Sequence, residues 1–95
     1  MEEAEREAVL QADLVLTGRR REDDAEVYLL AEVSAVIDPH DVERAAERAT
    51  LLEKLGRPVM PIVAGRQINA EVALLAREGG VWQVLDGQIT RPGSS

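Results

Sequence analysis

The feature that most constrains the fold is the apolar stretch EVYLLAEVSAVI at residues 26–37. Alternate side chains of a β-strand point to opposite faces of its sheet. One face of this stretch is apolar throughout and consists of Val27, Leu29, Ala31, Val33, Ala35 and Ile37. On the opposite face, polar residues beyond the start of the strand are limited to Glu32 and Ser34. The pattern predicts a long buried strand that carries one polar pair on one face.

A hairpin is predicted between this stretch and the preceding strand pattern, ADLVLTG. If the turn is centred on Glu22 and Asp23, Asp13 lies directly across from Glu32. Opposed Cβ atoms in such a pair are about 4.5–5.5 Å apart, so two carboxylates there require a shared proton, an arginine or a cation. A slip of one residue would separate the carboxylates but would also mismatch the apolar faces, which favours the paired register.

Two helices and two further strand regions are expected after the hairpin. Asp38 is a favourable N-cap and Pro39 a favourable first residue for a helix over 39–55, which stops at Gly56. The later elements are a strand at 59–64, with Pro61 pointing to an edge or irregular position, a helix at about 68–78, and a hairpin turned at Asp86-Gly87.

The length of 95 residues allows one domain, which we expect to span residues 1–95. Residues 1–11 would form an N-terminal helix or extension, and 91–95 a frayed tail. The order of elements predicts an α/β (mixed α+β) fold with a central mixed β-sheet flanked by helices. Tyr28 and Trp82 are the only aromatic residues, so the core is aliphatic. A core this small favours burial of more surface by self-association, and we expect a homodimer.

Composition disfavours several classes of protein. The net charge of −7 disfavours DNA as a partner, because the phosphate backbone supplies most non-specific affinity. No apolar run approaches the roughly 18 residues of a membrane span, and the N-terminus is acidic, unlike a signal peptide. We therefore expect a cytoplasmic protein with no membrane partner. The absence of cysteine excludes disulfides and thiolate chemistry.

Arg44 and Arg48 lie at i and i+4 on one flank of the predicted helix over 39–55. They follow the strand that carries Glu32, so their guanidinium groups have two possible destinations. One is the polar site on that strand, and the other is a surface carboxylate such as Glu43 or Glu47. The sequence leaves both open.

Four segments together resemble the restriction-endonuclease-like, or PD-(D/E)xK, nuclease superfamily over about residues 8–85. They are ADLVL with Asp13, EVS with Glu32, the helix DVERAAERATLLEKLG and the strand VMPIVAG. In that family an Asp on one strand and an acidic-x-Lys triplet on the next hold a catalytic magnesium ion. The resemblance implies a restriction-endonuclease-like core, with Asp13 and Glu32 as Mg²⁺ ligands, Ser34 at the lysine position, and Arg44 and Arg48 as auxiliary cations.

Ser34 is the chemical departure from that family. A neutral hydroxyl supplies no positive charge to position an attacking water or to offset charge in the transition state. One hypothesis is therefore a metal-dependent endonuclease acting on DNA with weak or absent activity. The other is a non-catalytic protein-interaction or dimerisation module that keeps the nuclease fold. The acidic charge and the missing lysine favour the module, whereas the carboxylate pair favours the nuclease.

Overall fold

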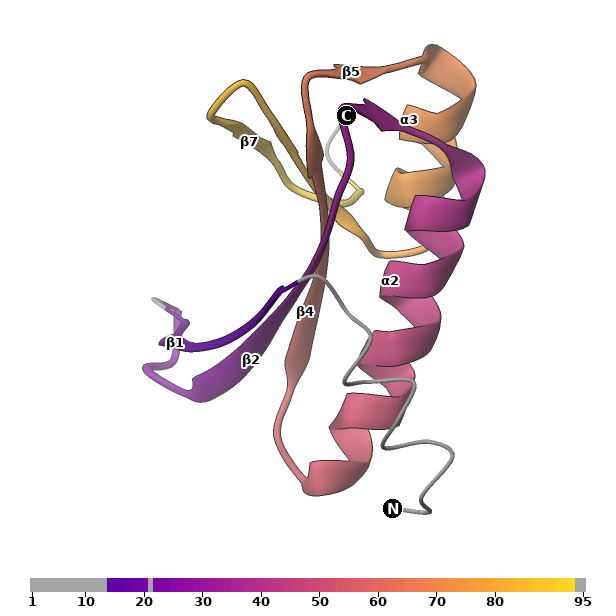
Figure 1. Ribbon diagram of the computed structural model, residues 1–95. Coiled ribbons are helices and arrows are strands. Elements are labelled where there is room, and N and C mark those ends of the chain that lie inside the picture. Colours follow the sequence, from indigo (N-terminus) through magenta and orange to yellow (C-terminus); the bar gives the residue numbers. More distant parts are fainter. Residues whose placement is uncertain (1–13, 21, 94–95) are drawn as a thin grey trace.

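The computed structural model describes residues 14–20 and 22–93, in which five strands form one mixed sheet with both α-helices on the same side (Figure 1). The sheet order is β1-β2-β4-β6-β7. Its strands are β1 (Leu14–Arg19), β2 (Glu26–Val33), β4 (Val59–Gly65), β6 (Trp82–Leu85) and β7 (Gln88–Thr90). The expected mixed sheet is confirmed. The N-terminal element expected at residues 1–11 lies outside the described residues.

The remaining elements are two α-helices, one 3₁₀ turn and a second, two-stranded sheet. The helices are α2 (Pro39–Leu52) and α3 (Ala70–Glu78), and the 3₁₀ turn η1 (Glu53–Leu55) continues α2. Gly56 ends this helical stretch in the left-handed conformation, with φ of 90°, as the sequence predicts. Strands β3 (Val36–Ile37) and β5 (Gln67–Ile68) pair in parallel and form the second sheet.

The β1–β2 hairpin has the register that the sequence predicts. Leu14 pairs with Ala31, and Leu16 pairs with Leu29. The turn is held by the Arg20 N–H, which donates to the Ala25 carbonyl at 2.9 Å. Even-numbered residues of β2 therefore face the helices, and odd-numbered residues face the opposite side of the sheet.

The rest of the sheet is built by helical crossovers and a closing hairpin. Strand β4 runs parallel to β2 through α2, and β6 runs parallel to β4 through α3. Strand β7 returns antiparallel to β6. Asp86 and Gly87 form this turn with φ of 47° and 81°, both left-handed, as a two-residue Asp-Gly turn requires.

The prediction of one long strand over 26–37 is wrong beyond Val33. Strand β2 ends at Val33, and residues 36–37 belong to the second sheet as β3. The Ser34 N–H still donates to the Ala64 carbonyl at 2.9 Å, but the chain then bends at Ala35. Both Arg66 and Gln67 donate their N–H to the Ala35 carbonyl, which anchors the bend. The strand therefore ends between Glu32 and Ser34, although Ser34 keeps this hydrogen bond to β4.

The edge or irregular position expected for Pro61 is also wrong, because β4 is a regular strand that lies between β2 and β6. The Pro58 and Ala64 carbonyls accept from β2, and alternate residues of a parallel strand bond to the same neighbour. The Pro61 nitrogen consequently faces β6. The pairing of β4 with β6 begins only at Ile62, so the sheet loses no hydrogen bond through the N–H that Pro61 lacks.

A reciprocal capping box starts α2. The Asp41 N–H donates to Asp38 Oδ1 at 2.9 Å, and the Asp38 N–H donates to Asp41 Oδ2 at 3.0 Å. Asn69 caps α3 through the Val72 N–H, so this helix begins at Ala70, whereas the sequence pattern started it at about 68. The two caps fix where each helix enters the layer over the sheet.

The main core lies between the helices and the sheet, and its members are all aliphatic. Leu30, Val63, Ala45, Ala76 and Val81 are completely excluded from solvent. The other members of this cluster are Ile37, Val42, Ala49, Leu52, Val59 and Val72.

Gly65 is a position where a side chain has no room. A Cβ there would overlap the Ser34 carbonyl oxygen and lie 3.0 Å from Cγ1 of Ile37. Gly65→Ala is expected to destabilise the fold by about 1–3 kcal/mol, measured by urea unfolding, because the backbone at the bend must shift. Gly18→Ala is the matched control, since its Cβ would meet only the Leu29 side chain, at 3.5 Å from Cδ1 and 3.9 Å from Cγ. Equal midpoints for the two variants would contradict this reading of the bend.

The cap of α2 predicts a pH dependence of stability. The hydrogen bond from the Asp41 N–H lowers the pKa of Asp38. A lowered folded-state pKa means that this stabilisation is present above about pH 3.9 and is lost as pH falls through the folded value. Asp38→Ser keeps a neutral cap, so its unfolding midpoint should fall less than that of the unmodified chain between neutral and acidic pH. Parallel midpoint curves for the two proteins would show that Asp38 does not contribute.

Candidate functional site

Glu32 is a charged residue inside the helix-facing side of the sheet. Its side chain is only 2% exposed. It follows Leu30 on the same face of β2 and pairs with Val63 of β4, and both of these neighbours are fully buried. An isolated carboxylate in such surroundings is strongly unfavourable, so its compensation determines what this site can do.

Two arginines of α2 supply that compensation. Arg44 Nε donates to Glu32 Oε1 at 3.0 Å, and Arg48 Nη1 donates to the same oxygen at 2.6 Å. The two arginines lie one turn apart, so both reach one carboxylate. Of the two destinations that the sequence left open, the strand carboxylate is the one observed. The Arg48 side chain is 15% exposed and that of Arg44 is 44% exposed, so Arg48 is the more enclosed partner.

Asp41 joins this network to the start of the helix. Arg44 Nη2 also donates to Asp41 Oδ1, and the Asp41 side chain is 2% exposed. The hydrogen bond to Glu32, followed by attraction to Asp41, raises the pKa of Arg44 against the opposing effect of burial. Among the described residues, the cluster thus contains two carboxylates and two guanidinium groups.

Without Asp13, which lies outside the described residues, this cluster does not by itself fit a magnesium site. Mg²⁺ requires oxygen ligands in an octahedral arrangement, and Glu32 Oε1 already accepts from two cationic groups that would repel a third. Asp41 is engaged by Arg44 and by the Asp38 N–H. Within residues 14–20 and 22–93, no group of three or more His, Cys, Asp or Glu side chains is placed to hold a metal ion.

The five residues predicted for the site are only partly brought together. Glu32, Arg44 and Arg48 form one cluster. Ser34 lies beyond the end of β2, at the bend before β3. Asp13, the other expected Mg²⁺ ligand, lies outside the described residues. Asp41 is not among the residues predicted for the site, although its i, i+3 spacing to Arg44 is the signal that could have indicated the contact.

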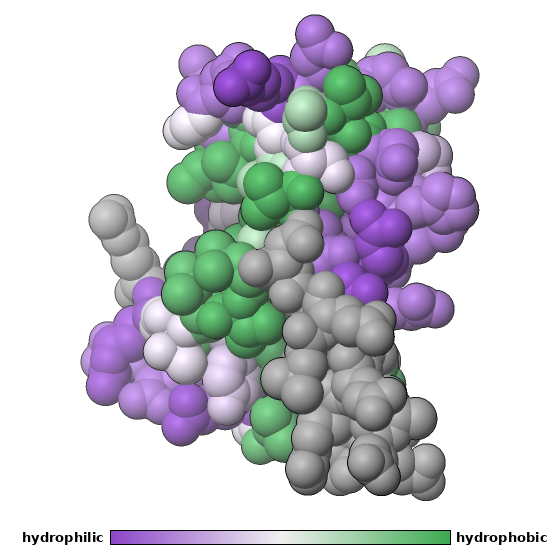
Figure 2. Space-filling view, viewed as in Figure 1, coloured by the Kyte–Doolittle hydropathy of each residue, from purple (hydrophilic) through white to green (hydrophobic). Residues whose placement is uncertain are grey.

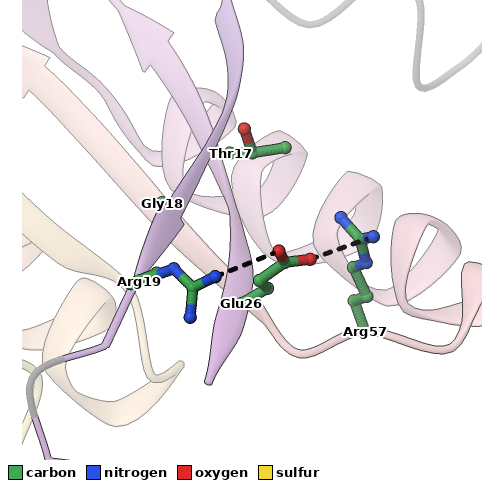
Figure 3. Close-up of a pocket in the computed structure, with 5 residues that line it drawn as sticks. All are labelled: Thr17, Gly18, Arg19, Glu26 and Arg57. Atoms are coloured by element: carbon green, nitrogen blue, oxygen red, sulfur yellow. Dashed lines mark ion pairs between the residues drawn. The ribbon is translucent and has the colours of Figure 1, made fainter. Parts of the chain in front are cut away.

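A second charged site, missed at the sequence level, lies on the same face at the other end of β2 (Figure 3). Glu26 forms ion pairs with Arg19 at 3.6 Å and with Arg57 at 3.0 Å, beside Thr17 and Gly18. These residues line a hollow of about 370 Å³. The three charged side chains are 44–60% exposed, so their pairing contributes little stability. The hairpin register alone places Arg19 opposite Glu26 and could have predicted half of this site.

A groove occupies the side of the sheet that faces away from the helices. It has a volume of about 850 Å³, and Val27, Leu29, Met60 and Trp82 contribute apolar surface to it. Its rim carries Arg19 and Arg20 near the β1–β2 turn and Arg91, the residue after β7.

Arg91 joins two distant parts of the chain across this groove. It pairs with Glu22 at 2.8 Å and lies over the Trp82 ring at 5.6 Å. The sequence places Arg91 in the frayed tail expected at 91–95, whereas its side chain makes both of these contacts. The sequence contains no signal for this contact, because it joins residues 69 positions apart.

Comparison with known proteins gives no assignment: no family model, no curated protein and no solved structure matches this chain. A membrane-spanning helix is also not found among the described residues. The geometry of the charged cluster and the exposed surfaces are therefore the basis for any functional inference.

We expect the loss of a carboxylate to lower stability much more at Glu32, in the buried network, than at Glu26. Glu32→Gln is expected to lower stability by about 3 kcal/mol in urea unfolding, because it removes the buried negative charge to which Arg44 and Arg48 donate. Glu26→Gln, at an exposed position on the same face of β2, should cost less than about 1 kcal/mol.

A combined variant separates charge compensation from packing. Adding Arg48→Met to Glu32→Gln should recover part of the loss, since the uncompensated guanidinium is removed. If Glu32→Gln were no more costly than Glu26→Gln, the network would not be the stabilising feature described above.

Proposed function

We propose that this chain is a non-catalytic protein-interaction module built on a restriction-endonuclease-like framework. The observation that carries the proposal is the pair of hydrogen bonds from Arg44 and Arg48 to Glu32, at 3.0 and 2.6 Å, on a carboxylate that is 2% exposed. Two guanidinium groups compensate the charge that a metal ion would compensate in a nuclease. The acidic residue of the family motif thereby becomes a structural anchor for α2.

The framework part of the proposal rests on the order and direction of the elements. An antiparallel hairpin, β1–β2, is followed by α2 and by β4 parallel to β2. That order is what the resemblance implies for the strands and helix around a nuclease site. The order of the elements supports a shared ancestry with these nucleases, whereas activity depends on the chemistry of the site.

The chemistry at the site argues against efficient phosphodiester hydrolysis. Arginine supplies positive charge but cannot serve as a base near neutral pH. Ser34 offers a neutral hydroxyl at the position where the family carries lysine. Loss of one such electrostatic group commonly lowers the rate by about 10²- to 10³-fold. The overall charge of −7 also slows the encounter with DNA.

The experiment incubates the purified chain with single-stranded, duplex and branched DNA in Mg²⁺ or Mn²⁺. We expect no metal-dependent cleavage and no rise in melting temperature with either metal, since a ligand that binds only the native state must stabilise it. Ser34→Lys is the variant that would restore the missing cation, and Asp13→Ala and Glu32→Gln are its controls.

The outcomes separate the two hypotheses. Cleavage by the unmodified chain that Asp13→Ala and Glu32→Gln abolish would overturn the proposal and establish a nuclease. Cleavage only by Ser34→Lys would show that a metal site persists and would overturn the view that Glu32 is purely an anchor. Inactivity throughout, without stabilisation by metal, is the result expected.

A further inference from the structure

The two outer hairpins of the sheet, β1–β2 and β6–β7, project on the side opposite α2 and α3 (Figure 1). In the same view, hydrophobic surface gathers between these hairpins, with hydrophilic surface above and below it (Figure 2). The groove of about 850 Å³ lies on this side, and residues of all five strands line it. Its shape therefore depends on how the two hairpins are held relative to each other.

Val27 lies at the closed bottom of this groove. It points away from the helices, as an odd-numbered residue of β2, and it does not belong to the main core cluster. Its side chain is nevertheless only 1% exposed. Leu16 of β1 points to the same side of the sheet and is 49% exposed. The groove thus shields part of this face from water and leaves the rest open.

Arg91 spans the groove from the end of β7. Its guanidinium group pairs with Glu22 of the β1–β2 turn at 2.8 Å and lies 5.6 Å from the centroid of the Trp82 ring. Strands β2 and β4 lie between β1 and β6 in the sheet, so one side chain contacts both sides of the groove. Among ion pairs between described residues, this pair alone joins the two outer hairpins.

The contact is weak enough to open. The Arg91 and Glu22 side chains are 63% and 65% exposed, and salt screens the attraction between exposed charges. The loss of one exposed ion pair shifts an equilibrium by no more than about five-fold. A contact of this strength favours one position of the hairpins without fixing it.

We propose that Arg91 and Glu22 form a strap that holds the β6–β7 hairpin to the β1–β2 turn and controls access to the groove. When the strap is closed, Arg91 covers the Trp82 ring and Val27 is shielded. When charge screening releases Arg91 from Glu22, the groove opens and Trp82 becomes accessible. This inference concerns the groove itself and does not rest on the proposed interaction function.

The test uses Trp82, which is the only tryptophan of the chain. Acrylamide is a neutral quencher, so the quenching of tryptophan fluorescence measures how accessible this ring is. The full chain is compared at about 0.01 M and about 1 M sodium chloride, where the Debye length is about 30 Å and about 3 Å. The quenching constant should rise with salt, by up to about five-fold, because the strap is an exposed ion pair.

Substitutions identify the pair responsible. Glu22→Gln should raise the quenching constant at low salt and remove most of its salt dependence. The matched control is Glu26→Gln, which removes one carboxylate of similar exposure, 49% against 65%, on the helix-facing side. That control should behave like the unmodified chain. In an Arg91→Gln background, Glu22→Gln should have no further effect, because the two residues act as one unit.

The salt comparison on the unmodified chain needs no substitution, and circular dichroism shows whether each variant is folded. A quenching constant that does not change with salt would overturn the strap. So would a Glu22→Gln variant that behaves like Glu26→Gln, or an effect of Glu22→Gln that persists without Arg91.

Discussion

The charge compensation of Glu32 is the constraint on which the arrangement of the structure depends. A carboxylate on the inner face of β2 must be neutralised, and Arg44 and Arg48 on successive turns of α2 neutralise it. Arg44 also contacts Asp41, which belongs to the capping box, so one network fixes the start, the rotation and the position of the helix. Apolar residues of similar volume often stabilise a fold as well as a buried ion pair does. The network is therefore best understood as specifying how α2 sits on the sheet.

The two faces of the sheet have different roles. The helix-facing side holds the aliphatic core and the buried charge network, whereas the opposite side carries the apolar groove and the exposed leucines of β1. The proposal of an interaction module rests on both faces: on the arginines that bind Glu32 on one side and on the exposed apolar side chains on the other.

Much of the fold could be predicted because the signals are local. Alternation in β1 and β2 sets the hairpin register, Asp38 with Asp41 marks the start of α2, and Asp86-Gly87 marks the last turn. The errors arose where distant strands decide the outcome. The chain bends after Val33 because β3 pairs with β5, and Pro61 is tolerated because its nitrogen faces β6 before that ladder begins. Neither neighbour can be identified from the local pattern.

For the site, the sequence by itself placed Glu32 on the face of its strand opposite the uninterrupted apolar face, and the predicted pairing with Asp13 indicated that this charge would need compensation. It also placed Arg44 and Arg48 on one flank of a helix. Only the tertiary structure decided that these arginines are the partner, because the crossover from β2 through α2 to β4 lays that flank over Glu32, 12 and 16 residues away along the chain. Whether an arginine or a metal ion compensates Glu32 depends on which charge the packed helix brings within hydrogen-bonding distance. Strand periodicity contains no information about that distance.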